Sequence, residues 1–281
     1  MQVFKQVLAL KNFVSSFKEQ NPKGIVGLVP TMGALHQGHL SLIEASKAQC
    51  DCTIVSIFVN PTQFGANEDF QKYPRQEEAD LNICQRAGVN AVFMPTCEEI
   101  YPFSPDWQVT FNAPKAMVEV LEGKVRPGHF NGVLQIVSKL FFLTRANKAF
   151  FGQKDAQQLL IIQKMVEDLF LPIEIVSCPI VRSIEGLALS SRNAYLSSEG
   201  KKQALKISQS LNVAIQAIMQ GNLQSESIKA LALEVLADLE VEYFVIVNRN
   251  LQEIPQIQKG SSLILVVVRV EGVRLLDNMW I

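Results

Sequence analysis

The chain has 281 residues, of which 48% are hydrophobic, and its 26 lysine and arginine residues nearly balance 27 aspartate and glutamate residues. This length and composition predict a globular protein with a full core, arranged as one large domain or two smaller ones. The near-neutral charge argues against nucleic acid as a partner, because a nucleic-acid-binding protein usually depends on a basic surface. Small-molecule chemistry is the better expectation.

The first twenty residues carry apolar side chains at helical spacing, from Val7 to Phe17, with lysines between them. We predict an amphipathic surface helix over Met1–Gln20, because no continuous apolar core of a signal peptide is present. The most hydrophobic run, Leu263–Val268, has the length of a strand and is too short to cross a bilayer. The five cysteines are scattered, which predicts reduced thiols. We therefore expect a cytoplasmic protein with no membrane partner.

Short apolar runs alternate with helical patterns up to about residue 180, which is typical of βαβ units and a parallel sheet. The expected strands are Ile25–Val29, Thr53–Val59, Ala91–Met94, Ala149–Phe151 and Ile173–Val176. The expected helices are Ser41–Gln49, Gln76–Ala87, His129–Leu143 and Asp155–Leu169. The fold class predicted for residues 1–180 is α/β, with a Rossmann-like parallel sheet.

The pattern changes in the last hundred residues. Two helical stretches, Glu199–Gln220 and Ser225–Leu239, come before three strand-like runs. These runs are Val241–Val247, Leu263–Val270 and Val273–Leu276, and a Glu-Gly pair between the last two indicates a tight hairpin. We predict a smaller α+β lid domain with an antiparallel sheet over residues 181–281, joined to the first domain by a short hinge.

The segment Pro30–Leu40 lies between an expected strand and an expected helix and contains His36 and His39. Gly33 and Gly38 permit a tight turn, and the following helix N-terminus offers N–H groups and a partial positive charge. Two imidazoles spaced three residues apart could donate to an anionic phosphate without a permanent charge. The alternative is a glycine-containing turn with two solvated histidines.

Two further polar segments follow expected strands. In Asn60–Gly65, the amide of Gln63 could donate to a carboxylate and accept from a hydroxyl. Lys154 and Asp155 follow the expected strand Ala149–Phe151, where lysine suits a phosphate, and Gln158 would lie one helical turn further along. A polar capping loop and a surface Lys–Asp pair are the alternatives. Ligands of open α/β sheets bind beyond the carboxyl ends of the strands, so we expect all three segments along one edge.

Two remaining segments carry polar groups that the helices and strands do not explain. Ser190, Ser191 and Arg192 lie near the predicted domain junction and could close on a triphosphate, although an ordinary serine-rich turn is the alternative. The third histidine, His129, begins an apolar helix and could cap it. Lys124 and Arg126 nearby could neutralise an anion, although an ordinary solvated loop is the alternative.

Taken in order, these segments resemble the pantothenate synthetase (pantoate–β-alanine ligase) family over essentially the whole chain. The motifs are Pro30–Leu40, Asn60–Gly65 with Tyr73-Pro74-Arg75, Arg126–Val133, Phe151–Gln158 and Gly186–Asn193. The His-x-Gly-His turn also resembles the signature of the nucleotidyltransferase superfamily. The resemblance implies condensation of (R)-pantoate with β-alanine through a pantoyl adenylate. ATP would be a substrate, Mg²⁺ a cofactor, and AMP and pyrophosphate would be released as products. The resemblance also implies a homodimer.

The resemblance also implies roles for single residues. The ATP contacts would come from Met32, Gly33, Ala34, Leu35, His36, Gln37, Gly38, His39, Gly152, Gln153, Lys154, Asp155, Val181, Leu189, Ser190, Ser191 and Arg192. The catalytic groups would be His39, His36, Lys154, Arg192, Ser190 and Ser191. Gln63 and Gln158 match the glutamines that hold pantoate, and Gln63 also lies near the β-alanine position. The sequence departs from the family pattern at Gln153, Ala156, Leu189 and Gln135, which bears mainly on adenine packing.

Two alternatives remain at this point. A nucleotidyltransferase acting on a phosphorylated substrate would fit the histidine turn, but Gln63 and Gln158 favour a small hydroxy acid. A catalytically silent nucleotide-sensing or RNA-binding module fits poorly with the near-neutral charge. The magnesium ligands stay open, because the acidic stretch after Gln63 is either a metal site or a solvated helix face. Its members are Glu68, Asp69, Glu77, Glu78 and Asp80.

Overall fold

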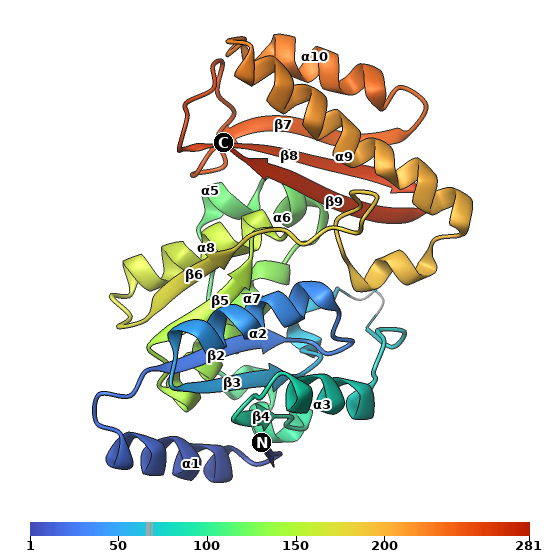
Figure 1. The fold of residues 1–281 in the computed structure, drawn as a ribbon. Coiled ribbons are helices and arrows are strands. Elements are labelled where there is room, and N and C mark those ends of the chain that lie inside the picture. Colours follow the sequence, from blue (N-terminus) through green and yellow to red (C-terminus); the bar gives the residue numbers. More distant parts are fainter. Residues whose placement is uncertain (66–67, 69) are drawn as a thin grey trace. The chain divides into compact units, whose positions relative to one another are not determined.

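The computed structural model describes residues 1–65, 68 and 70–281. The chain forms two compact units, each with its own sheet (Figure 1). The first unit comprises Met1–Gly152 and Ile161–Cys178, and the second comprises Gln153–Leu160 and Pro179–Ile281. Within the described parts of the chain, no helix combines the length and the apolar character that a membrane crossing requires.

The first unit is built on a six-stranded sheet in which all neighbouring strands run parallel. Across the sheet, the strands are β1 (Gln2–Phe4), β4 (Ala91–Phe93), β3 (Cys52–Ile57), β2 (Val26–Thr31), β5 (Lys148–Gly152) and β6 (Glu174–Cys178). Strand β3 is buried throughout and β2 over its first four residues, which explains why both sequences are nearly continuous apolar runs. The predicted parallel sheet is confirmed.

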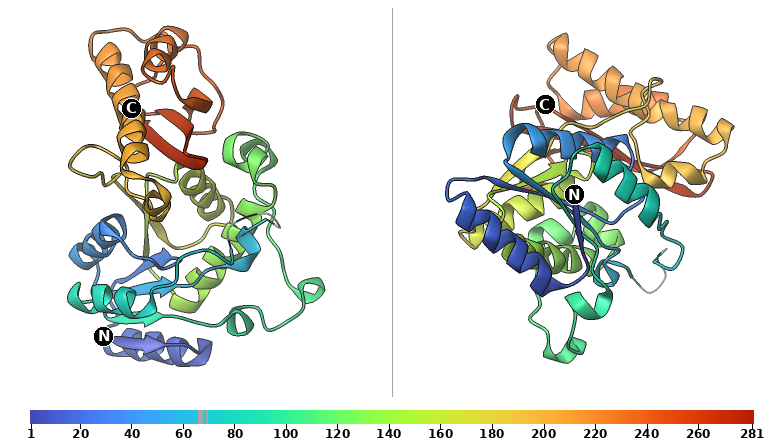
Figure 2. Two further views of the ribbon diagram at one scale, coloured as in Figure 1. Left: turned by 90° about the vertical axis from the view of Figure 1, so that its right-hand side faces the viewer. Right: turned by 60° about the horizontal axis from the view of Figure 1, so that its bottom comes forward.

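The N-terminus differs from the single helix predicted over Met1–Gln20. Gln2–Phe4 form the edge strand β1, which pairs with β4, and helix α1 runs from Val7 to Gln20 (Figure 2). The helix begins where the Val7 N–H donates to Glu99 Oε1 at 2.6 Å. A three-residue strand is too short to show a period of two, so its partner strand, and not its own sequence, decides its structure.

Helices follow the strands of the first unit close to the predicted positions. The longer ones are α2 (Gln37–Gln49), α3 (Glu77–Arg86), α7 (His129–Thr144) and α8 (Ala156–Asp168), the last of which runs from the second unit into the first. The shorter ones are η1 (Pro61–Gln63), α4 (Cys97–Ile100), η2 (Pro105–Trp107), α5 (Lys115–Val118) and α6 (Leu121–Val125). Leu42 and Ile43 of α2 pack with Val29 and Val55 of the sheet. Each such buried side chain stabilises the fold by about 1.5–3 kcal/mol.

The second unit has an antiparallel sheet of three strands, β7 (Glu240–Asn248), β8 (Ser262–Val270) and β9 (Val273–Trp280), with β8 in the middle. Helices α9 (Ser198–Met219) and α10 (Ser225–Val235) and the short η3 (Ser191–Tyr195) complete it. On α9, buried residues recur every three or four positions, at Ala204, Ile207, Leu211 and Ala214, and they join the apolar core formed with the sheet. The predicted α+β arrangement with an antiparallel sheet is confirmed.

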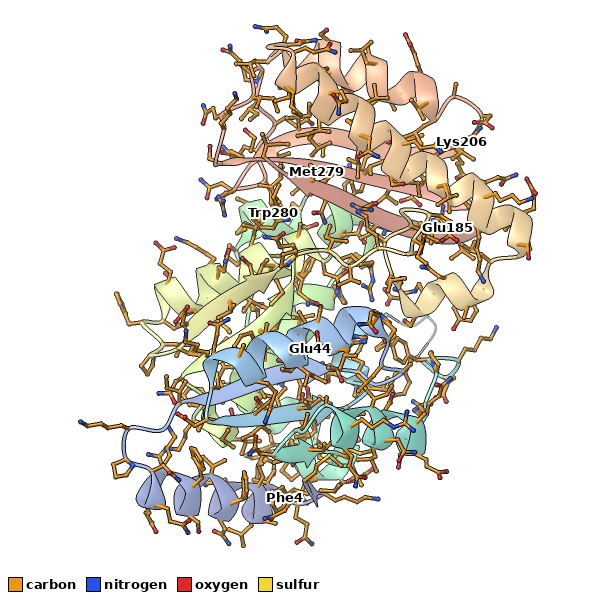
Figure 3. All side chains as sticks on the ribbon, in the orientation of Figure 1. Phe4, Glu44, Glu185, Lys206, Met279 and Trp280 are labelled. Atoms are coloured by element: carbon orange, nitrogen blue, oxygen red, sulfur yellow. The ribbon has the colours of Figure 1, made fainter. Side chains whose placement is uncertain are left out.

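Strand β9 extends four residues beyond the predicted end at Leu276. The hydrophobic pattern stops there because Asp277 and Asn278 follow, yet both are buried, with exposed fractions of 4% and 2%. Met279 then packs against the core, and the Trp280 ring lies under the Arg249 guanidinium (Figure 3). Two buried polar residues in a strand require partners, and these partners lie in segments that the sequence singled out.

Candidate active site

The chain leaves β2 through two residues in the left-handed region, Gly33 with φ 86° and Ala34 with φ 50°. For a residue with a Cβ, this conformation costs about 1–3 kcal/mol. Asp80 of α3 offsets that cost, because its Oδ2 accepts from the Ala34 N–H at 2.9 Å and its Oδ1 from the Leu35 N–H at 2.7 Å. We call this pair of bonds the Asp80 clamp. It fixes the backbone just before the two histidines.

Asp80 is therefore not part of a solvated helix face. Only 1% of its surface is exposed, and burial raises the pKa of its carboxyl, while the N–H groups of Leu35 and Ala34 act in the opposite direction. Glu77 and Glu78, one turn earlier on the same helix, are exposed. Both oxygens of Asp80 accept from backbone groups, so this carboxylate serves to hold the turn.

The two histidines cap helix α2 reciprocally. The His36 Nδ1 accepts from the Gly38 N–H at 3.1 Å, and the His39 Nδ1 accepts from the His36 N–H at 3.2 Å. The helix consequently begins at Gln37, four residues before the predicted start at Ser41. The rings lie 4.1 Å apart between centroids. Gly38 permits this arrangement, since a Cβ there would lie 2.8 Å from His36 Cε1.

This cap decides which ring nitrogen carries the proton. A backbone N–H can only donate, so each Nδ1 must be the unprotonated acceptor. In the neutral ring the proton then resides on Nε2, which makes Nε2–H the donor end of both His36 and His39. The arrangement supplies two neutral imidazole donors at a helix N-terminus, where an anion is stabilised.

The segment after β3 is organised by Asn60, a fully buried amide. Its Oδ1 accepts from the Tyr101 hydroxyl at 2.7 Å and the Thr62 hydroxyl at 3.0 Å. Its Nδ2 donates to Gln63 Oε1 and to the Gly132 carbonyl, both at 3.1 Å. Burial raises the pKa of Tyr101 to about 12, so its hydroxyl stays protonated. Each hydrogen-bonding group of the Asn60 side chain is used to hold the Gln63 loop.

Two of the predicted site residues, Gln63 and Met32, are in contact. The Gln63 Nε2 donates to Met32 Sδ at 3.0 Å, which links the loop after β3 to the turn after β2. The loop also lies tightly against α7, because a Cβ on Gly132 would sit 2.2 Å from the Thr62 carbonyl oxygen. Strands β2 and β3 are adjacent and parallel, so the two polar segments share one edge of the sheet.

In the second unit, the buried polar residues of β9 hold the segment that follows β5. The Asn278 Nδ2 donates to the carbonyls of Gln153 at 2.9 Å and Lys154 at 2.7 Å. The Lys154 Nζ lies 3.4 Å from Asp155 Oδ1, and 57% of the Asp155 side chain is exposed. Gln158 lies half-buried on α8. The surface Lys–Asp pair that was the alternative interpretation is present, although Lys154 itself is mostly buried.

Asp277 holds the second polar segment of this unit. Its carboxylate accepts from Arg182 through two bonds, at 2.5 and 2.8 Å, and the guanidinium also donates to the Gly186 carbonyl at 3.2 Å. The Leu189 N–H donates to the Val181 carbonyl at 3.0 Å, which joins the two ends of this segment. The Ser190 Oγ then accepts from the Arg192 N–H at 3.3 Å and caps η3.

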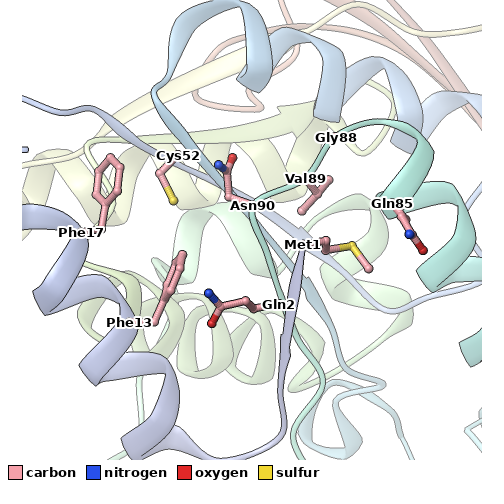
Figure 4. A pocket seen from close by; sticks show the side chains of 9 residues that line it. All are labelled: Met1, Gln2, Phe13, Phe17, Cys52, Gln85, Gly88, Val89 and Asn90. Carbon is pink, nitrogen blue, oxygen red and sulfur yellow. The ribbon is translucent and has the colours of Figure 1, made fainter.

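A cavity of about 370 Å³ lies on the first unit (Figure 4). It opens near α1 and the amino ends of β1, β3 and β4, which is the edge of the sheet opposite to Gln63 and the histidines. Its lining residues are Met1, Gln2, Phe13, Phe17, Cys52, Gln85, Gly88, Val89 and Asn90. Burial raises the pKa of Cys52 to about 11, so the thiol remains protonated and is a poor nucleophile. The cavity contains none of the predicted site residues.

Protein ligands for a metal ion are sparse in the part of the chain that the structure describes. No group of three or more His, Cys, Asp or Glu side chains is clustered there in a way that could hold an ion. Within the acidic stretch, Asp80 bonds to the turn and Glu68 pairs with Arg126, whereas Asp69 lies outside the described residues. The described residues thus do not form a dedicated magnesium cage.

Comparison with known proteins gives consistent matches over the full chain. The profile of the family described as Pantoate-beta-alanine ligase matches residues 2–280. A pantothenate synthetase of Wolinella succinogenes is 62% identical over 259 residues, which are 92% of this chain and 94% of that protein.

Two solved structures are similar as well. The pantothenate synthetase of Thermus thermophilus has a TM-score of 0.92 at 37% identity, and the match covers 99% of both chains. A pantoate-beta-alanine ligase of Francisella tularensis, solved in complex with β-γ ATP and β-alanine, has a TM-score of 0.80 at 34% identity. That match covers 100% of this chain and 97% of the other.

The Asp80 clamp predicts the effect of Asp80→Asn. This change keeps the side-chain volume but turns one acceptor into an N–H donor that faces a backbone N–H. The free energy of unfolding should therefore fall by about 1–3 kcal/mol. Hydrogen exchange should show faster exchange at the amide of Ala34 or Leu35. Glu78→Gln, at an exposed position of the same helix, is the matched control. Unchanged protection of both amides in the Asn variant would contradict the clamp.

Proposed function

The chain belongs to the pantoate–β-alanine ligase family, and on that premise we propose that it condenses (R)-pantoate with β-alanine while cleaving ATP to AMP and pyrophosphate. The observation that carries the proposal is the reciprocal cap, which makes Nε2–H the donor end of two histidines at a helix N-terminus, in the same turn as Met32, the partner of Gln63. The Francisella tularensis relative, solved with an ATP compound and β-alanine, supports the same pairing of substrates.

The first step of the proposed reaction is transfer of an adenylyl group. The pantoate carboxylate attacks the α-phosphorus of ATP in line, an acyl phosphate bond forms, and the bond to pyrophosphate breaks. Positioning and charge stabilisation dominate such a transfer. His39 and His36 donate to phosphate oxygens through Nε2, and Lys154 and Arg192 stabilise the oxygens that gain charge.

Further contacts complete the proposed site. Ser190 and Ser191 hold the outgoing phosphates, and Gln63 and Gln158 hold pantoate. The ATP contacts extend over Met32 to His39, Gly152 to Asp155, Val181, and Leu189 to Arg192. No nucleophilic side chain is needed.

In the second step, the amine of β-alanine attacks the acyl carbon of pantoyl adenylate and AMP leaves. The mixed anhydride between pantoate and AMP hydrolyses if water reaches it, so the site must be closed during this step. We propose that residues 181–281 act as the lid. Within it, Asp277 bonds to Arg182, and Asn278 ties it to the carbonyls of Gln153 and Lys154, which are two of the proposed nucleotide contacts.

Magnesium is proposed to enter as the complex with ATP, and not as an ion held by protein ligands alone. Mg²⁺ is usually bound through one or two carboxylates together with substrate phosphates and water, and the described residues offer no larger cluster. A cytoplasmic location is proposed because the reaction consumes ATP. Cell fractionation that recovered the chain with the membranes would contradict this location.

Product analysis tests the proposed reaction. Release of AMP and formation of pantothenate should require ATP, pantoate, β-alanine and Mg²⁺ together, and should stop when each is omitted in turn. With pantoate and Mg²⁺ but without β-alanine, labelled pyrophosphate should exchange into ATP, because adenylate formation is reversible. An active enzyme that lacks this exchange would rule out the two-step route, and activity with CTP and a phosphorylated acceptor would favour a nucleotidyltransferase.

Two substitutions separate the chemistry of His39 from its structural role. His39→Asn can keep an acceptor for the His36 N–H but has no group at the Nε2 position, whereas His39→Ala loses both. Both variants should lose at least ~100-fold in kcat/KM, and only the Ala variant should unfold at a lower temperature. Glu44→Ala, at an exposed position of α2, serves as the control (Figure 3). A near-normal rate in the Asn variant would limit His39 to capping.

A homodimer is also proposed, with support from an exposed apolar segment of the first unit. Around η2, the side chains of Phe103, Trp107 and Val109 are exposed to 65%, 82% and 83%. A second copy that covers such side chains would remove apolar area from water. Sedimentation should give twice the chain mass of 31.3 kDa. Trp107→Ser should shift the equilibrium towards monomer, and a monomeric wild type at micromolar concentration would contradict the dimer.

A further inference from the structure

His129 is the one histidine for which the proposed reaction has no role. It is the first residue of α7, and only 8% of its surface is exposed. The residue at the N-cap is Gly128, so the predicted alternative of a capping side chain is not what the structure shows. Instead the ring reaches into the Gln63 loop. Its Nδ1 lies 2.7 Å from the Gln63 carbonyl oxygen and its Nε2 lies 3.1 Å from Arg126 Nη1.

The two partners of the ring fix its protonation state. A carbonyl oxygen can only accept, so Nδ1 must carry a hydrogen, and a guanidinium can only donate, so Nε2 must be the acceptor. Both conditions are met by the neutral ring with its proton on Nδ1. This is the opposite tautomer to that of His36 and His39. The ring acts as a bridge between Arg126 and the Gln63 backbone.

Arg126 is itself held in one orientation. Its Nε and Nη2 donate to the two oxygens of Glu68 at 2.9 and 2.5 Å, which is a bidentate pair, and the two side chains are only 20% and 23% exposed. Burial by itself would raise the pKa of Glu68, but the hydrogen bonds and charge of Arg126 lower it below the ordinary value. The Arg126 Nη2 also donates to the Gln63 carbonyl at 3.3 Å. That carbonyl therefore accepts from both Arg126 and His129.

The side chain of Gln63 is fixed at its other end. Asn60 Nδ2 can only donate, so the oxygen of the Gln63 amide must face it at 3.1 Å, and the nitrogen must face Met32. The loop is thus held through its backbone by Arg126 and His129 and through its side chain by Asn60. Of these contacts, the one between His129 and the carbonyl is the shortest.

We propose that His129 is a positioning residue for the hydroxy acid substrate: it holds the Gln63 backbone so that the Gln63 amide meets pantoate in a single orientation. The proposal rests on the proposed function, because it assigns Gln63 to pantoate. An error of about 1 Å in the placement of a binding group can cost about 100-fold. Loss of the bridge should therefore raise KM for pantoate while KM for ATP stays the same, because only Met32 among the proposed ATP contacts touches Gln63.

Three substitutions at this position separate the two halves of the bridge. In His129→Asn, the amide nitrogen takes the place of Nδ1 and still donates to the Gln63 carbonyl. In His129→Gln, the amide reaches the place of Nε2 and can accept from Arg126, but the Gln63 carbonyl keeps only the longer bond from Arg126 Nη2, at 3.3 Å. His129→Ala lacks both groups. We expect KM for pantoate to stay near the wild-type value in the Asn variant and to rise about 10- to 100-fold in the Gln and Ala variants, with smaller changes in kcat.

Two further variants complete the experiment. Glu68→Gln leaves the ring in place but weakens the hold on Arg126, so it should raise KM for pantoate in the same direction and by less, even if a His129 variant fails to fold. Lys124→Ala, at an exposed position of α6, should change neither constant. Thermal unfolding of each variant is measured alongside the kinetics.

The outcomes separate the two proposals. If the wild-type enzyme forms no pantothenate from its three substrates, the proposed function fails. If the wild type is active but the Gln and Ala variants keep their KM for pantoate, the role of His129 is overturned. The same holds if the Asn and Gln variants are equally impaired and equally destabilised, because this result would mark a structural role only. Rescue by Asn together with an unchanged KM for ATP supports the positioning role.

Discussion

A single buried carboxylate holds the turn on which the proposed chemistry depends. Asp80 accepts hydrogen bonds from two backbone N–H groups of a turn in which Ala34 has a left-handed conformation. Hydrogen bonds to a charged acceptor contribute about 1.5–3 kcal/mol each, which is enough to offset both the strain at Ala34 and part of the cost of burial. With the turn fixed, His36 falls at the N-cap of α2, and the ring nitrogens of both histidines are assigned their roles by the backbone.

The second unit uses the same principle with other residues. Asp277 and Asn278 lie in a strand where the pattern calls for apolar side chains, and each bonds to a polar segment that is far away in sequence. Buried polar groups in a strand are costly when unpaired. Here their partners are the carbonyls of Gln153 and Lys154 and the guanidinium of Arg182, so these two residues order the very loops that carry the proposed nucleotide contacts.

Several features of the molecule could be predicted from the sequence because they are local. The apolar runs indicated five strands of the parallel sheet, and the histidine turn, the Gln63 loop and the lysine segment were identified at strand ends. Strand β1 could not be predicted, because three residues form a strand only when β4 is beside them. The continuation of β9 past Leu276 was missed for a related reason. Asp277 and Asn278 look like loop residues until their partners are known.

The supporting residues of the site were missed because their roles depend on distant contacts. Asp80 looks like one acid among several at the start of a helix, and only its burial separates it from Glu77 and Glu78. His129 was noticed but was assigned no role, since its partner Gln63 lies 66 residues earlier in the chain. The glycine of the His129 helix that packs against Thr62 gave no signal beyond its place in a family motif.

The position of Asp80 in the chain has a consequence for the order in which the protein is made. The amide of Leu35 leaves the ribosome 45 residues before the carboxylate that accepts from it. Strand β2 and the histidines are therefore synthesised without the group that shapes the turn between them, and the turn can be fixed only after α3 has emerged and docked. The turn that is proposed to bind phosphate is in this sense a late product of folding, although its residues are among the first to be translated.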